Sequence, residues 1–233
     1  MTDSPRLVTV ERWGRTTYED AHRRQLALLE ARIAGEVGDT IVLTEHEPVV
    51  TCGRKSDAGE LGALDVPVVE VERGGEATYH GPGQLVAYPI ILLPDSRRDL
   101  HRYLRDLEQA AIGVLGEFGV AGRREPGLTG VWIGDHKVCS LGVAVRRWVT
   151  WHGLALNVHT DLSAFGGFSP CGLQPGVMTR LADHADVPPG LFLIEVLLIK
   201  HLLLALGLDL PEPPPLASPG PENDFPQLPI LPG

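Results

Sequence analysis

The spacing of apolar residues along the chain changes repeatedly between a helical and an extended period. Helical spacing, with apolar residues three and four positions apart, occupies residues 18–34, 97–118 and 189–206. Ser96 stands where the second segment needs an N-cap, and Gly119 follows that segment directly. The pattern therefore predicts three helices, of which the second lies between Ser96 and Gly119.

Extended runs rich in β-branched residues lie between the helical segments. In the first half of the chain they are 40–44, 49–53, 66–72, 76–80 and 84–93, and in the second half they are Val131–Ile133, Val143–Val149 and Leu154–Val158. Strands that alternate with helices in a chain of 233 residues are typical of a single α/β domain.

Two segments near the C-terminus differ in composition from the rest. Residues 189–206 are strongly apolar, but Glu195, Lys200 and His201 divide them into runs too short to cross a bilayer, so we predict a buried helix. Residues 211–233 hold nine of the twenty prolines and neither lysine nor arginine. This composition is typical of a disordered or extended tail, and we expect the folded domain to cover residues 1–210.

Composition and charge narrow the class of protein. A hydrophobic fraction of 43% with 21% charged residues is ordinary for a globular protein. The net charge of −10 argues against a general nucleic-acid binder, because phosphate recognition needs a basic face. The first residues lack the basic and apolar regions of a signal peptide, and three widely spaced cysteines fit a reducing compartment better than a disulfide framework. We therefore expect a cytoplasmic protein that binds neither nucleic acid nor a membrane.

The segment from Arg73 to Gln84 is the most distinctive candidate for a binding site. It contains four glycines between two extended runs, and glycine lets a backbone approach a ligand closely. Two interpretations fit, a long hairpin connection and the wall of a pocket. The segment has neither the third glycine of a dinucleotide-binding loop nor the Gly-Lys-Ser/Thr of a P-loop, so it does not predict a phosphate site.

Two cysteines compete for the role of a nucleophile. Cys139 lies in a strand-like run whose period-two alternation puts Lys137 on the same face, whereas Cys171 lies in the loop 168–172, from which a thiol can face a pocket. A nearby cation favours the reactive thiolate, but cysteine is also among the most buried residue types. These residues alone do not choose between the two. No set of His, Cys, Asp or Glu shows the spacing of metal ligands.

Three ordered blocks of the sequence carry a resemblance to a known family. The first is Arg73–Gln84 followed by Tyr88–Ile90, the second runs from Gly134–Lys137 through Ser140–Gly142 to Arg146–Asn157, and the third is Pro170–Gly172. Together they resemble the octanoyltransferase (lipoate–protein ligase B) family over about residues 7–205. The resemblance implies a monomeric, single α/β domain of the biotin/lipoate protein ligase type, with a large mixed β-sheet, a small second sheet and flanking helices.

The resemblance also implies a reaction. Cys171 would take an octanoyl group from octanoyl-acyl carrier protein as an enzyme thioester, and Lys137 would lower the pKa of the thiol and exchange protons with it. The acyl group would then pass to a lysine ε-amine on the lipoyl domains of 2-oxo acid dehydrogenase complexes or on the glycine cleavage H protein. Because a thioester is already activated, neither a cofactor nor a metal is expected.

The resemblance places the substrate against three segments of the chain. Their residues are Arg73, Gly74, Gly75, Glu76, Ala77, Thr78, Tyr79, His80, Ser140, Leu141, Gly142, Gly153, Leu154 and Ala155.

Two other functions fit parts of the sequence. An ATP-dependent lipoate or biotin ligase on the same fold would share the Arg-Gly-Gly segment but would not need Cys171. A non-catalytic protein that binds acyl carrier protein would need neither Lys137 nor Cys171. For His80 and His152 two alternatives stay open. One is a direct role in substrate contact or proton transfer, and the other is a purely structural role.

The acidic chain also carries three pairs of adjacent cations, Arg54-Lys55, Arg123-Arg124 and Arg146-Arg147. Acyl carrier proteins are themselves acidic, so their association requires a local basic patch. We expect the first or the third pair to supply it, because both lie beside segments that resemble pocket elements. The alternative is that each pair is only a solvated face.

Overall fold

The structure, a computed structural model, describes residues 6–56, 65–166, 173 and 176–211. Cys171 and the tail beyond residue 211 lie outside these residues, so the predictions for them stay predictions. The α-helices in the described part are α1 (Tyr18–Ala34), α2 (Leu100–Gly116) and α3 (Leu191–Leu206). The strands there are β1 (Val8–Thr16), β2 (Asp39–His46), β3 (Val49–Cys52), β4 (Val68–Glu70), β5 (Thr78–His80), β6 (Gln84–Ile90), β7 (Gly122–Arg123), β8 (Val131–Ile133), β9 (His136–Arg146) and β10 (Val149–Asn157).

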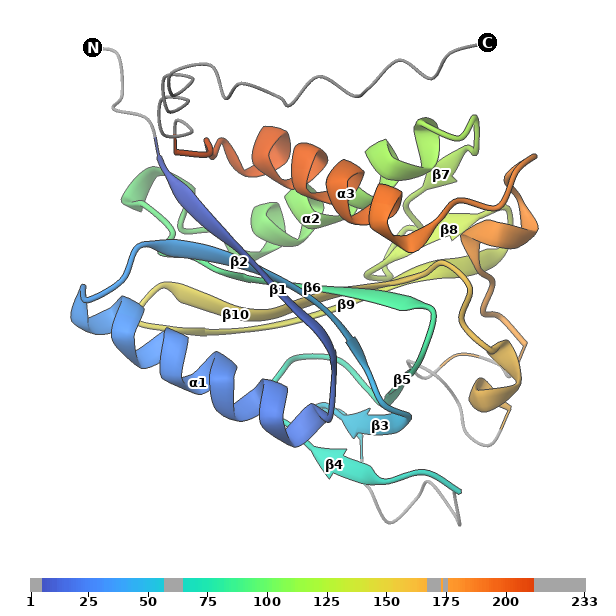
Figure 1. Ribbon diagram of the computed structural model, residues 1–233, viewed down its shortest axis with the longest axis horizontal. Coiled ribbons are helices and arrows are strands. Elements are labelled where there is room, and N and C mark those ends of the chain that lie inside the picture. The colour runs from blue at the N-terminus through green and yellow to red at the C-terminus, as the bar shows by residue number, and fades with distance from the viewer. Residues whose placement is uncertain (1–5, 57–64, 167–172, 174–175, 212–233) are drawn as a thin grey trace, which may run out of the picture.

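The strands form a large sheet and a small one. The large sheet has seven strands in the order β1-β2-β6-β10-β9-β8-β7, and it is mixed because β1 runs parallel to β2 while the other neighbours are antiparallel. The small sheet has the order β4-β3-β5. Helices α2 and α3 cover one face of the large sheet and α1 covers the other (Figure 1). The predicted α/β class, with a large mixed sheet, a small second sheet and flanking helices, is confirmed.

Two apolar clusters bury the faces of the large sheet. The larger cluster joins the sheet to α2 and α3 and includes Leu107, Leu154 and Leu202, which are almost completely buried. The second cluster joins the opposite face to α1 through Leu29 and Val42. Full burial of one such side chain contributes about 1.5–3 kcal/mol to folding. The sheet is thereby held from both sides as a rigid support for the residues at its centre.

The three helices confirm the predicted pattern, although three of their boundaries are shifted. Helix α1 spans the predicted residues, and α3 begins two residues later than predicted. The prediction for α2 is wrong at both ends. Asp99 is its N-cap, with a carboxylate that accepts from the amides of His101 and Arg102. Ser96 instead lies in a separate 3-10 turn, and the helix ends at Gly116 rather than at Gly119.

Helix α3 is buried along one face only. Ile194, Leu198 and Leu202 are completely buried, whereas Phe192 and Leu204 are each 70% exposed. The prediction of a buried helix therefore holds for the inner face and is wrong for the outer one. None of the described helices combines the length and the apolar character that a membrane span requires.

The apolar pattern does not predict β1 or β7. Strand β1 is at the edge of the sheet, and its partly exposed positions include Glu11, Arg12 and Arg15, which hide the apolar alternation. Strand β7 has two residues and no period to read. The apolar pattern therefore fails at β1 because of its edge position, and at β7 because of its short length.

Candidate active site

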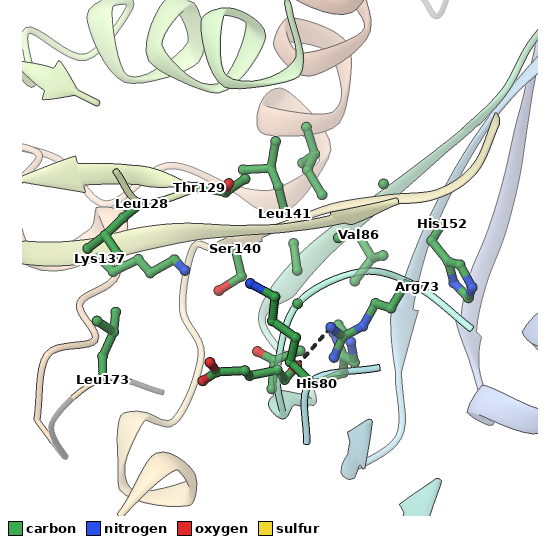
Figure 2. A pocket seen from close by; sticks show the side chains of 18 of the residues that line it. Arg73, His80, Val86, Leu128, Thr129, Lys137, Ser140, Leu141, His152 and Leu173 are labelled. Carbon is green, nitrogen blue, oxygen red and sulfur yellow. Dashed lines mark hydrogen bonds between the residues drawn. The ribbon is translucent and has the colours of Figure 1, made fainter. Parts of the chain in front are cut away.

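A cavity of about 190 Å³ lies between the two sheets, beside the glycine-rich segment (Figure 2). Strand β5 of the small sheet forms one wall, and β6, β9 and β10 of the large sheet form the floor. Tyr18 at the start of α1 and Lys55 after β3 complete the lining, together with Leu173. The fold thus brings the first and second predicted blocks together at one site.

Arg73 holds the glycine-rich loop in place. Its side chain is 7% exposed and donates hydrogen bonds to the carbonyls of Gly74 at 3.1 Å, Glu76 at 2.8 Å and Thr51 at 2.8 Å. Hydrogen bonds from a charged donor are stronger than neutral ones. The amide of Gly74 in turn donates to the carbonyl of Val143 on β9 at 3.0 Å. Arg73 therefore fixes the loop against both sheets.

Alternate residues of this segment reach the cavity. Arg73, Gly75, Glu76, Thr78 and His80 line it. Successive side chains of a strand point to opposite faces, and Ala77 and Tyr79 accordingly lie in a small apolar cluster behind the wall. The structure does not bring Gly74, Ala77 or Tyr79 to the cavity.

The floor of the cavity is built around two paired glycines. In the register of β9 and β10, Gly142 faces Gly153, Leu141 faces Leu154 and Ser140 faces Ala155, and all six line the cavity. A Cβ atom at Gly142 would come within 2.8 Å of Arg73 Cδ, and one at Gly153 within 2.1 Å of the carbonyl oxygen of Ala87. Both positions therefore need glycine for the loop and the neighbouring strand to approach so closely.

Lys137 and Cys139 do not share a face, contrary to the period-two prediction. The register of β8 and β9 is interrupted there, since Val131 pairs with Cys139 but Trp132 pairs with Lys137, so that Val138 is an extra residue. Val138 and Cys139 both lie in the large apolar cluster, whereas Lys137 lines the cavity with Ser140. Burial raises the pKa of the Cys139 thiol to about 12, although the charge of Lys137 opposes this. Cys139 is thus a buried core thiol in surroundings that disfavour its thiolate.

Lys137 lies at one end of the cavity. Its side chain is 3% exposed, and its Nζ is 5.2 Å from the centroid of the Trp132 ring. Leu128 and Leu173 lie beside it, and Figure 2 shows Lys137 and Ser140 at the opposite end from His152. The backbone of Lys137 also pairs with the chain that follows Leu173, because its amide donates to the carbonyl of Val177 at 2.7 Å.

His80 begins a chain of buried hydrogen bonds. Its Nδ1 is 2.7 Å from Oε1 of Gln84, the Nε2 of Gln84 donates to Asn157 at 2.9 Å, and Asn157 donates to the carbonyl of Thr179 at 3.0 Å. Burial and the charge of His46 hold the pKa of His80 well below its usual range. His80 is therefore neutral near pH 7 and connects the small sheet to the segment beside Lys137.

His152 lies in the cavity wall with a strained backbone. Its φ is 56°, in the left-handed region that non-glycine residues seldom adopt. Its side chain is 2% exposed, and burial, together with the charge of Arg73, lowers its pKa to about 3. The imidazole is therefore neutral near pH 7. The sequence singled out His152 but could not show that it lies in the wall.

Several lining residues escaped the sequence analysis because they come from outside the three blocks. They are Tyr18, Val86, Gly127, Leu128, Thr129 and Leu173. The glycine-rich turn Gly127–Gly130 was the one available signal, since Gly130 has a φ of 141° and a Cβ there would meet Lys137 Cε at 2.6 Å. Lys55 and Tyr88 also line the cavity. Lys55 belongs to one of the three pairs of adjacent cations, and Tyr88 belongs to the first block.

The arrangement suits acid–base chemistry on a ligand that is partly apolar. A lysine at one end can exchange protons, and Val86, Leu141 and Leu154 offer an apolar surface in the middle. Because Gly142 and Gly153 have no side chains, the backbone of β9 and β10 lies close to any group bound in the cavity. Such a cavity can hold a short acyl chain with its reacting end at Lys137.

Comparisons with known proteins show the family to which the chain belongs. Residues 17–201 match the model of the lipoyl protein ligase A/B catalytic domain. The chain is 51% identical over 179 residues to an octanoyltransferase from Gloeobacter violaceus, covering 75% of this chain and 81% of that protein. It is 48% identical over 169 residues to an octanoyltransferase from Geobacter metallireducens, covering 72% of this chain and 79% of that protein.

Solved structures share the fold at low sequence identity. A putative lipoate protein ligase from T. acidophilum with bound lipoic acid has a TM-score of 0.69 at 18% identity, over 89% of each chain. A biotin protein ligase from Aquifex aeolicus has a TM-score of 0.53 at 14% identity, over 86% of this chain and 70% of that one. These likenesses confirm the biotin/lipoate protein ligase type of fold.

Proposed function

Because the chain belongs to the lipoyl protein ligase A/B catalytic-domain family, we propose a course for its reaction in which Cys171 carries the acyl group and Lys137 moves the protons. The chain is an octanoyltransferase that acts in protein lipoylation, as its similarity to octanoyltransferases at 48–51% identity shows. The finer assignments of donor, acceptor, intermediate and residues are part of the proposal.

The position of Lys137 is the observation that carries this proposal. Lys137 lines the cavity together with Leu173, which is two residues from Cys171 in the sequence. Two residues of extended chain span at most about 7 Å. This reach supports a thiol at position 171 acting at the end of the cavity where Lys137 lies, whereas Cys139 lies in the apolar core.

The first half-reaction forms the acyl-enzyme. The thiolate of Cys171 attacks the thioester carbonyl of octanoyl-acyl carrier protein, the bond from the carbonyl carbon to the carrier sulfur breaks, and the carrier leaves as a thiol. Lys137 takes the proton of Cys171 and gives it to the departing sulfur. Arg73, Gly75, Glu76, Thr78 and His80 form the wall that holds the octanoyl chain.

The second half-reaction makes an amide. The ε-amine of a lysine on a lipoyl domain, of a 2-oxo acid dehydrogenase complex or of the glycine cleavage H protein, attacks the enzyme thioester. Lys137 accepts a proton from the amine, and Cys171 leaves as the thiolate. The floor residues Ser140–Gly142 and Gly153–Ala155 complete the acyl site. The backbone amides of Leu141 and Gly142, or those of Cys171 and Gly172, stabilise the oxyanion.

The remaining proposals concern the catalytic region, the oligomeric state, the location and the docking surface of the enzyme. We assign catalysis to residues 1–210 acting as a monomer in the cytoplasm. The carrier protein docks at Arg54 and Lys55, of which Lys55 lines the cavity. Among the described residues these two cations make no ion pair, whereas Arg123, Arg124 and Arg146 each pair with a carboxylate.

The test separates a transferase from an ATP-dependent ligase on the same fold. The chain is incubated with octanoyl-acyl carrier protein and a lipoyl domain, without nucleotide, in parallel with free octanoate and ATP. We expect octanoyl-lipoyl domain in the first mixture only. Product in the second mixture alone would establish the ligase, and carrier binding without product in either would establish a non-catalytic protein.

A further inference from the structure

Three side chains from separate parts of the sequence meet beside the far end of the cavity. His22 lies on α1, Glu72 precedes the glycine-rich loop and His152 lies on β10. One ligand atom from each lies within 4.8 Å of the other two, and His22 Nε2 is 3.2 Å from Glu72 Oε2. No sequence spacing could reveal this group, because the fold alone assembles it.

One ring nitrogen of His152, its Nε2, is buried and unpartnered among the described residues. A buried polar atom without a partner costs about 1–3 kcal/mol. The backbone strain at φ 56° adds to this cost. The buried, strained imidazole of His152 and the two neighbouring groups, an imidazole and a carboxylate, form a set of three potential ligands for a cation.

We propose that His22, Glu72 and His152 bind one zinc ion. Two imidazoles and one carboxylate form a common zinc ligand set, which leaves a fourth position for water. Trp151 orients the two rings, since its own ring centroid is 4.2 Å from that of His152 and 5.7 Å from that of His22.

Access and charge also fit a zinc ion. The side chain of Glu72 is 51% exposed and that of His22 is 24% exposed, so that an ion can enter from solvent. The nearby charge of Arg73 opposes a cation, and the carboxylate of Glu72 offsets it.

Zinc at this place ties α1 to β10 and to the start of the glycine-rich loop. A ligand that binds only the folded state stabilises it, so zinc raises the melting temperature. His152 also lines the cavity, at the end away from Lys137 (Figure 2). His22, Glu72 and His152 are not among the residues proposed to hold or transfer the acyl group, although the two sets adjoin in the cavity wall. Zinc affinity and melting temperature therefore test the proposal without a measurement of acyl transfer.

The experiment is a zinc titration of the full chain carrying Cys171→Ala, which removes a thiol that could compete for zinc. Competition with a chromophoric chelator gives the affinity, and a thermal melt gives the stabilisation. We expect one zinc per chain and a higher melting temperature. His22→Gln, Glu72→Gln and His152→Asn should each weaken binding by more than about tenfold and abolish the thermal shift. Asparagine is chosen at 152 because it tolerates the left-handed backbone.

Two controls make the outcome decisive. His201→Gln removes an imidazole that pairs with Glu117 elsewhere on the surface, and it should leave zinc binding unchanged. The absorption spectrum of bound cobalt(II) should show nitrogen and oxygen ligands without thiolate. Two results would overturn the proposal even if His152→Asn failed to fold. One is the absence of zinc binding, and the other is an undiminished zinc affinity in His22→Gln and Glu72→Gln.

Discussion

The amide of Thr179 donates a hydrogen bond to the carbonyl of Lys137 at 2.9 Å. Strand β9 is thereby joined to the chain that follows the proposed nucleophile by eight residues in the sequence. Asn157 supports this junction, because its side chain donates to the carbonyl of Thr179 and accepts from Gln84. The position of Lys137 relative to that segment thus depends on the buried side chain of Asn157, which is not among the described residues that line the cavity.

Asn157→Ala should weaken this junction. The variant removes the side-chain donor to the carbonyl of Thr179. It also removes one of the two acceptors of the Gln84 amide, which still donates to the carbonyl of Tyr79. A buried polar group that loses its partner costs about 1–3 kcal/mol. We expect a lower free energy of unfolding in urea and a lower kcat for acyl transfer. Wild-type stability together with wild-type kcat would show that the junction does not position Lys137.

The two floor glycines should respond differently to alanine. Gly153→Ala puts a methyl group within 2.1 Å of a backbone oxygen, which cannot move aside, so this variant should fold poorly. Gly142→Ala meets Arg73 Cδ at 2.8 Å and the carbonyl oxygen of Gly74 at 3.0 Å, so it should displace the glycine-rich loop, lower the melting temperature less than Gly153→Ala and lose most transfer activity. Gly116→Ala has nothing within 4 Å and serves as the control, with stability unchanged or slightly higher. Thermal melts and transfer rates of the three variants, measured in parallel, check this order.

Lys137 should control the reactivity of the nucleophilic thiol. An ammonium group near a thiol favours the thiolate, so Lys137→Ala should slow alkylation of Cys171 near neutral pH and reduce transfer strongly. Lys137→Arg keeps the charge but is a poor base, so it should retain alkylation better than transfer. Alkylation of Lys137→Ala at the wild-type rate would make Lys137 a structural residue.

Acid should destabilise the protein through its buried histidines. Burial lowers the pKa of His46 to about 4, and its Nε2 is 2.6 Å from the hydroxyl of Tyr88. Below its usual pKa of about 6.5 the unfolded chain takes up a proton that the folded chain refuses. The stability from this group is therefore complete above pH 6.5 and is lost as the pH falls to 4, by about 3 kcal/mol.

The control for this pH dependence is His46→Gln, which keeps a hydrogen-bonding group but does not titrate. Its free energy of unfolding, measured in urea from pH 7 to pH 4, should fall less steeply than that of the wild type. Parallel curves for the two proteins would show that His46 is not a source of the acid sensitivity.

Charge reversal at Arg54 and Lys55 should impair use of the carrier protein. The double change to glutamate should raise the KM for octanoyl-acyl carrier protein several-fold, and added salt should weaken the wild type by screening. For the single variant Arg54→Glu, activity with a small octanoyl thioester should change little, because Arg54 does not line the cavity. Arg123→Glu is the matched control, because Arg123 already pairs with Glu125 and Asp135. An equal KM in the double variant and in the wild type would exclude docking at this pair.

The sequence was most informative where local signals were strong. Thr17 caps α1 and Gly35 ends it in the left-handed conformation, so its limits could be predicted from the apolar period and the terminal glycine. The start of α2 could not, because Ser96 and Asp99 are both good caps and only the packing of the 3-10 turn selects Asp99.

The residues of the site could likewise be predicted only in part from the sequence. The family resemblance indicated Lys137, Ser140–Gly142 and Gly153–Ala155, and all of them line the cavity. The alternation argument failed at Lys137, because a bulge at Val138 is set by pairing with β8 and leaves no mark in the local sequence. Tyr18 and the His22 group come from distant segments, and only tertiary structure brings them together.

The acyl-enzyme is tested most directly by intact mass spectrometry after mixing the protein with octanoyl-acyl carrier protein, followed by peptide mapping. We predict one octanoyl adduct per chain, located at Cys171, absent in Cys171→Ala and present in Cys139→Ala. An adduct that survives in Cys171→Ala, or one located at Cys139, would contradict the proposed mechanism.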